Sequence, residues 1–223
     1  MLGLTLRHPW PWAVLFLGKS IENRDWSDDF ARNIMKLDDA MHRPLAIHGG
    51  KAPKRGNNQA WREFEQDVRY LFEVANSSTT IRRLMRAHFK DRDNRPVLED
   101  FILPGIVGVA QISRADRSGT GPWAVPGALH LRLSDVQALD QAVPHRGALG
   151  FWEVEYGAQL AVRQQLPMLP SVFPLNPPAE GCAGCQGQTF EDGYICCWTC
   201  GRELPSQQAV EVIEAETREW LGL

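Results

Sequence analysis

The chain has 223 residues, a formal net charge of −3 and 43% hydrophobic residues, and these values are ordinary for a soluble globular protein. No apolar run reaches the roughly 18–20 residues needed to cross a bilayer, and the first residues lack a signal-peptide pattern. We therefore expect a cytoplasmic protein with no membrane partner. The length suits one larger domain and a small appendage.

Charge and residue types divide the chain in two. Residues 1–160 carry 21 Lys and Arg against 19 Asp and Glu, and they hold all six histidines. Residues 161–223 carry 3 basic and 8 acidic residues, and they hold all five cysteines. Residues 161–180 are rich in proline, which removes backbone donors and disfavours helix and central strand. We expect a domain over 1–160, a linker over 161–180 and a second unit over 181–223.

Short strands and a few helices are predicted for the first domain. Strands bounded by Gly and Pro are expected at 3–7, 20–25, 44–48, 105–112, 128–133 and 148–155. Helices are expected at 9–18, with proline in its first turn and glycine at its end, at 57–76, with a 3.6-residue apolar period, and at 79–90. This pattern predicts an α+β fold in which a small β-barrel, whose closure removes unpaired edges, has flanking helices.

The strand at 20–25 carries the most informative polar residues. Glu22 and Arg24 share one of its faces, because side chains alternate along a strand, and Lys19 lies just before it. An acid between two bases predicts a compact polar site. A surface ion-pair ladder on an exposed strand is the alternative.

Cysteines dominate the second unit. Cys182 and Cys185 form one Cys-x-x-Cys pair, and Cys197 and Cys200 form another. Two such pairs suit tetrahedral coordination of Zn²⁺ by four thiolates, which leaves no open position, so the zinc is expected to be structural in a zinc ribbon with a C-terminal helix. Disulfides, which a cytosolic chain does not keep, and a redox motif are the alternatives. Cys196 is read as a small buried apolar residue.

Residues 3–155 resemble the ASCH (activating signal cointegrator homology) domains, which belong to the PUA-like barrels. The family signature G-x-K-x-x-E-x-R is matched by Lys19, Glu22 and Arg24, although Gly18 stands one place after the expected glycine. The stretch His8–Ala13 is similar to the family's Q-P-W-A opening, with His8 in place of Gln. Further similar stretches follow in family order at 45–51, 105–110 and 146–153.

The resemblance implies a PUA-like barrel with a cleft at Lys19, Glu22 and Arg24 that receives nucleic acid or a nucleoside. A carboxylate can accept from the exocyclic amine of a base, and an arginine can grip phosphate or stack on a base. Trp10, Trp26 and Trp152 are candidate stacking faces, with core packing as the alternative. We expect His48 or Trp152 on the wall of the cleft, and a satisfied core histidine is an equal alternative for His48.

Basic residues outside the signature predict a phosphate-tracking surface beside the cleft. Lys51 follows a strand end, and Arg82 and Arg86 occupy successive turns of the helix at 79–90. A solvated helix face is the alternative.

Two functions are consistent with these features. The first is a binding module that holds single-stranded RNA or another single-stranded nucleic acid, or a modified nucleoside. The second is a hydrolase acting on RNA or on an acylated nucleoside such as N4-acetylcytidine, with Lys19 and Glu22 as catalytic groups. The chain resembles the long, tryptophan-rich ASCH branch more than the small amidohydrolases, so binding is favoured.

Overall fold

The computed structural model describes residues 1–90, 96–166, 189–191, 194–196 and 203–204. The chain divides into two compact units, Met1–Met168 and Leu169–Leu223, and each is described by itself. Over the described residues, every helix is too short or too polar to span a membrane.

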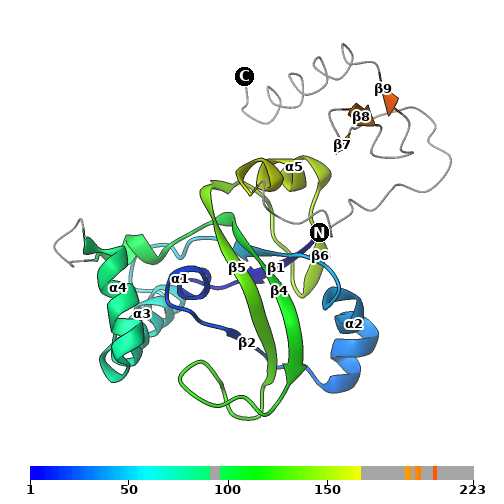
Figure 1. Cartoon of the computed structure of the whole chain (residues 1–223). Helices are drawn as coiled ribbons and strands as arrows, with labels where there is room; N and C mark the ends of the chain where they lie inside the picture. Colours follow the sequence, from blue (N-terminus) through cyan, green and yellow to red (C-terminus); the bar gives the residue numbers. More distant parts are fainter. Residues whose placement is uncertain (91–95, 167–188, 192–193, 197–202, 205–223) are drawn as a thin grey trace. The chain divides into compact units, whose positions relative to one another are not determined.

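The first unit is an α+β fold built on a curled six-stranded sheet (Figure 1). Its strands are β1 (Leu2–Leu6), β2 (Ile21–Arg24), β3 (Leu45–Gly49), β4 (Gly105–Asp116), β5 (Leu129–Val143) and β6 (Phe151–Glu153). They lie in the order β2-β5-β4-β3-β1-β6. β1 and β3 are parallel, and the other neighbouring pairs are antiparallel. The six predicted strands are confirmed, and β5 extends past its predicted end at residue 133.

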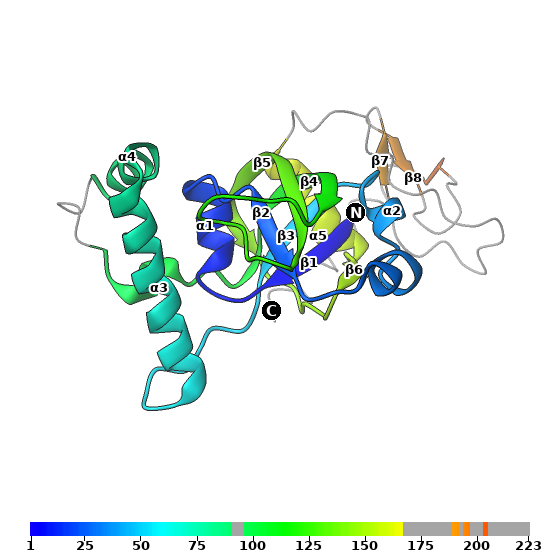
Figure 2. The same cartoon turned by 90° about the horizontal axis from the view of Figure 1, so that it is seen from below.

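The helices surround this sheet. α1 (Trp10–Phe16) lies between the sheet and the pair formed by α3 (Gln59–Ser77) and α4 (Thr79–His88) (Figure 2). These three helices confirm the sequence prediction. The structure adds η1 (Phe30–Ile34), α2 (Leu37–Ala40), η3 (Leu98–Phe101) and α5 (Tyr156–Gln165), none of which was predicted. α5 crosses residue 160, so regular structure continues past the predicted end of the domain.

Apolar side chains form two cores. One lies within the curl of the sheet and contains Leu4, Ile47 and Leu131, all with no exposed area. The other lies between α1 and the α3–α4 pair and contains Trp12, Phe64 and Leu71. α1 belongs to both, because Val14 packs in the first core and Trp12 in the second. The helix that precedes Lys19 is therefore fixed from two sides.

The curl brings the two ends of the sheet order towards each other. The register between β4 and β5 shifts at three places, and such bulges bend and twist a strand pair. An Arg24 guanidinium nitrogen in β2 donates to the Thr5 carbonyl in β1 at 3.1 Å, although β5, β4 and β3 lie between these strands in the order. The sheet ends at β2 and β6, so the described strands curl without the hydrogen-bonded closure that we predicted.

Three short strands are described in the second unit. β7 (Thr189–Glu191), β8 (Tyr194–Cys196) and β9 (Glu203–Leu204) form an antiparallel sheet in that order. The predicted zinc ligands Cys182, Cys185, Cys197 and Cys200 lie outside the described residues, as do the linker after residue 166 and the predicted C-terminal helix.

Candidate functional site

Lys19 is positioned by the end of α1. Gly18 follows the helix with a φ of 68°, a left-handed conformation that glycine adopts without steric cost. The Lys19 amide then donates to the Ala13 carbonyl at 3.1 Å, and the chain turns into β2. Leu17, at the place of the signature glycine, is buried in the core beside Trp12. Glycine at position 18 thus performs the turn that delivers the lysine.

Lys19, Glu22 and Arg24 form one ionic network. The Lys19 ammonium lies 2.9 Å from Glu22 Oε2 and also donates to the Ile21 carbonyl. Glu22 Oε1 lies 3.3 Å from an Arg24 guanidinium nitrogen. Lys19 is only 3% exposed and Glu22 is 9% exposed. The alternative of a surface ion-pair ladder is therefore wrong, because a charged pair at this depth is shielded from solvent.

Lys19 and Glu22 lie in a pocket of about 350 Å³, which we call the Lys19 pocket. Its other lining residues are Arg7, Trp10, Asn23, Asp67, Tyr70, Pro122, Trp123, Ala124 and Val125. The Lys19 ammonium sits 5.6 Å from the centre of the Trp10 ring, and Trp10 meets Tyr70 edge to face. The pocket thus combines a buried acid–base pair with aromatic walls.

One wall of the Lys19 pocket is the loop before β5. The Asn23 amide donates to the Trp123 carbonyl and accepts from the Val125 amide, both at 2.9 Å. The Tyr70 hydroxyl donates to the Pro122 carbonyl at 2.5 Å, and the buried His130 ring contacts the Val125 carbonyl at 2.9 Å. Contacts from β2, α3 and β5 therefore hold this wall in place.

Sequence reasoning missed Trp123, Tyr70 and Asp67. Trp123 lies in a Gly- and Pro-containing loop. Tyr70 lies on the face of α3 away from its predicted apolar stripe, and Asp67 lies at the edge of that stripe. Polar or aromatic residues on a helix face outside the apolar stripe are the sequence signal that could have indicated these lining positions. Arg7 donates to Asp67 at 2.9 Å, yet burial raises the pKa of the Asp67 carboxyl, with Arg7 acting in the opposite direction.

Arg24, His48 and Trp152 do not line the Lys19 pocket, but they continue its network. Arg24 reaches the Thr5 carbonyl, and the Trp152 indole nitrogen donates to the Thr5 hydroxyl at 3.1 Å. His48 packs edge to face on Trp152, with ring centres 5.5 Å apart. The place of His48 or Trp152 on the wall of the predicted cleft therefore stays a prediction.

His48 is a core histidine with one satisfied nitrogen. It is 4% exposed, and its Nε2 lies 2.9 Å from the His145 carbonyl, which requires a proton on that nitrogen. Its Nδ1 finds no hydrogen-bond partner among the described residues. Burial lowers the pKa of the His48 imidazole, and the His145 carbonyl acts in the opposite direction. The neutral ring is therefore favoured in the folded protein.

The predicted basic residues come from segments on either side of α3. The loop that carries Lys51 leads to one end of α3, whereas α4, with Arg82 and Arg86, begins at the other end (Figure 2). A helix of 19 residues spans about 28 Å at 1.5 Å per residue. Lys51 and the pair Arg82 and Arg86 thus come from segments on opposite sides of α3 in the chain, and one shared phosphate-tracking surface stays a prediction.

Trp26 is not among the residues that line the Lys19 pocket. The Arg24 guanidinium lies 5.5 Å from the centre of the Trp26 ring, and Trp26 meets Phe151 of β6 edge to face. The Trp26–Phe151 pair therefore packs beside Arg24, next to the terminal strand β6. Of the three candidate stacking tryptophans, Trp10 is the one in the Lys19 pocket.

No family model and no curated protein matches this chain. Within the described residues, no group of three or more His, Cys, Asp or Glu side chains is arranged to hold a metal ion.

Proposed function

We propose that the protein is a PUA-like, ASCH-type module that binds single-stranded RNA by holding one base, or a nucleoside, in the Lys19 pocket. The observation that carries the proposal is the buried Lys19–Glu22 pair in a pocket walled by Trp10, Tyr70 and Trp123. Small-molecule sites typically combine apolar or aromatic walls with a few fixed polar groups, and the pocket has both.

The Glu22 carboxylate supports recognition of a base edge. Each carboxylate oxygen has two lone pairs, and Lys19 and Arg24 occupy one acceptor direction on each. The remaining directions can accept from an exocyclic amine, such as that of cytosine or adenine. Trp10 offers an aromatic face on which a base can stack, as is common in the recognition of single-stranded RNA.

A hydrolase is the second candidate, because a lysine beside a carboxylate in a pocket can also carry out general acid–base catalysis. The contacts of Lys19 favour binding. Its ammonium already donates to the Glu22 carboxylate and to the Ile21 carbonyl, so these contacts hold it as a hydrogen-bond donor in the pocket. Turnover of N4-acetylcytidine by the purified protein, abolished by Lys19→Met, would decide for the enzyme.

Titration with cytidine and with short single-stranded RNA and DNA tests the binding proposal. Trp10→Leu removes one aromatic wall and keeps the ion pair, and we expect at least about tenfold weaker binding, since stacking contributes roughly 1–3 kcal/mol per base. Arg55→Gln is the matched control, because Arg55 is exposed and lies outside the pocket. Equal affinity of wild type and Trp10→Leu for every probe would refute the proposal.

We also propose, from the sequence, that Cys182, Cys185, Cys197 and Cys200 bind one structural Zn²⁺. Four thiolates suit tetrahedral zinc, and metal binding supplies folding free energy to a unit too small for a large core. Metal analysis of the purified protein is expected to give one zinc per chain. Cys197→Ala should lose the metal, and the neighbouring Cys196→Ala should keep it. A wild-type protein without zinc would refute this assignment.

A further inference from the structure

A second pocket, the α3–α4 pocket, has about 510 Å³ and is lined by Phe72, Ala75, Asn76, Arg82, Met85, Arg86, Phe89 and Pro96. Its volume falls within the range of about 300–1,000 Å³ typical of small-molecule sites. It shares none of its lining residues with the Lys19 pocket. The two sites are therefore separate.

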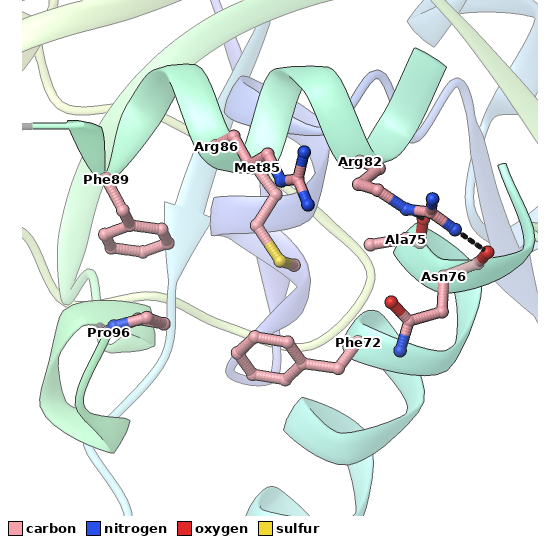
Figure 3. Close-up of a pocket in the computed structure, with 8 residues that line it drawn as sticks. All are labelled: Phe72, Ala75, Asn76, Arg82, Met85, Arg86, Phe89 and Pro96. Carbon is pink, nitrogen blue, oxygen red and sulfur yellow. Dashed lines mark hydrogen bonds between the residues drawn. The ribbon is translucent and has the colours of Figure 1, made fainter. Parts of the chain in front are cut away.

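The pocket exists because two helices diverge from one residue. Ser78 ends α3 and also caps the start of α4, where its hydroxyl accepts from the Ile81 amide. Figure 3 shows Phe89 and Met85 descending from α4, and Phe72 extending from α3 towards the same space. The Phe89 ring also stacks on the Trp12 ring, with ring centres 5.4 Å apart, and this contact holds it in place. The Phe89 part of the apolar floor is thus supported by Trp12.

The two arginines of the pocket differ in their hydrogen-bond partners. Arg82 donates to the carbonyls of Ala75 and Asn76 at the end of α3, as Figure 3 shows for Asn76. Arg86 is exposed and has no hydrogen-bond or ion-pair partner among the residues that the structure describes. α4 carries no acidic residue. An anion at the rim would therefore meet an unpaired guanidinium and a second one close by.

We propose that the α3–α4 pocket binds a nucleotide, with the base over the floor formed by Phe72, Met85 and Phe89 and the phosphate on Arg86. Bases stack on aromatic side chains, and arginine forms short, charge-assisted and often bidentate hydrogen bonds to phosphate. The exposed Asn76 amide offers a base edge both a donor and an acceptor, which an acyl chain would not use.

The nucleotide has two sources with the same chemistry, a free mononucleotide or one unit of a single strand. The strand-bound form rests on the proposed function, whereas the free form does not. The test uses AMP, adenosine, a pentaadenylate RNA and octanoate as probes, with the Met85 methyl resonance as the local readout. Met85→Leu identifies that resonance among the five methionines.

AMP is expected to shift the Met85 methyl resonance, and adenosine, which lacks the phosphate, to bind at least about tenfold more weakly. Arg86→Gln should weaken AMP binding by about the same factor. Arg83→Gln is the matched control, because Arg83 is an exposed residue of the same helix outside the pocket, and it should change affinity less than twofold. Tighter binding of pentaadenylate than of AMP would assign the strand as the source, and the reverse would assign the free nucleotide.

Three results would overturn the inference. They are no shift of the Met85 methyl with any adenine probe, equal losses in Arg83→Gln and Arg86→Gln, or octanoate binding as tightly as AMP, which would indicate a site for apolar anions. Trp10→Leu should leave AMP binding at Met85 unchanged, and Arg86→Gln should leave cytidine binding unchanged. Failure of this inference is thereby distinguished from failure of the function proposed for the Lys19 pocket.

Discussion

The Lys19 pocket and the α3–α4 pocket place their charges in opposite ways. In the first, Lys19 and Glu22 are buried and paired with each other. In the second, the floor is apolar and Arg86 stands exposed at the rim. A buried pair is part of the folded structure, because removal of one partner leaves the other charge without compensation. A rim charge can serve a ligand at almost no cost to folding.

The largest expected effect comes from breaking the buried pair. Glu22→Ala leaves the Lys19 ammonium buried with the Ile21 carbonyl and the Trp10 ring but without its carboxylate, and we expect a loss of roughly 3–5 kcal/mol in the free energy of unfolding, measured by urea denaturation. A Lys19→Met, Glu22→Leu double variant should recover most of that loss, since well-packed apolar replacements of buried pairs are often neutral. A Glu22→Ala protein within about 1 kcal/mol of wild type would show that the pair is not the structural element described here.

The turn that delivers Lys19 should give the next largest effect. Gly18→Ala forces a residue with a Cβ into a φ of 68°, which costs roughly 1–2 kcal/mol, although the nearest atom to that Cβ is 3.9 Å away. Gly157→Ala is the control, because Gly157 lies in α5 with open space around its Cβ position, and it should be neutral or slightly stabilising. Equal thermal midpoints for the two variants would contradict the strain argument.

Acidification should weaken the part of the network around His48. Burial lowers the pKa of His48 and also that of His8 in the folded state, whereas a histidine in the unfolded chain titrates near about 6.5. The unfolded chain therefore binds more protons as the pH falls below that value, so the free energy of unfolding should decrease from pH 7.5 to 5.5. His48→Gln should make this decrease smaller. An unchanged pH dependence in that variant would contradict the assignment.

The smallest effect is expected at the rim of the α3–α4 pocket. Arg86→Gln should change the free energy of unfolding by no more than about 0.5 kcal/mol, as is usual for exposed positions without partners. Urea denaturation of Arg86→Gln and of Glu22→Ala under the same conditions compares the stability effects at the two pockets directly. A loss above about 1 kcal/mol would mean that Arg86 contributes to packing, and that its exposure is not a sign of availability.

The sequence predicted the elements whose signals are local. Strands such as β3 are short apolar runs between Gly and Pro, and the period of α3 is long enough to detect. η1 and α2 escaped detection because each is under six residues, which is too short for a periodic signal. The second half of β5 mixes apolar and polar residues, and its pairing with β4 through bulges depends on contacts distant in sequence.

The candidate site was predictable only in part for the same reason. The spacing of Lys19, Glu22 and Arg24 places Glu22 and Arg24 on one strand face, which the ion pair between them confirms. Spacing carries no information on depth, so burial of the pair was not foreseen. Lys51 and Arg82 were grouped because they flank the same helical segment, and spacing alone does not show whether their side chains share one surface. The loop wall with Trp123 is fixed by side chains from β2, α3 and β5 that no local pattern connects.

The bridge from Arg24 to the Thr5 carbonyl has a consequence for the motions of the sheet. It is a side-chain hydrogen bond between strands that share no backbone hydrogen bonds. The same Arg24 pairs with Glu22. A ligand that competes for the Glu22 carboxylate would therefore also disturb the side chain that links β2 to β1. We therefore expect opening fluctuations of β1 and β2 to depend on whether the Lys19 pocket is occupied. The hydrogen-exchange rates of the β1 amides should then change when a ligand binds in that pocket, through the contacts that Arg24 makes with Glu22 and Thr5.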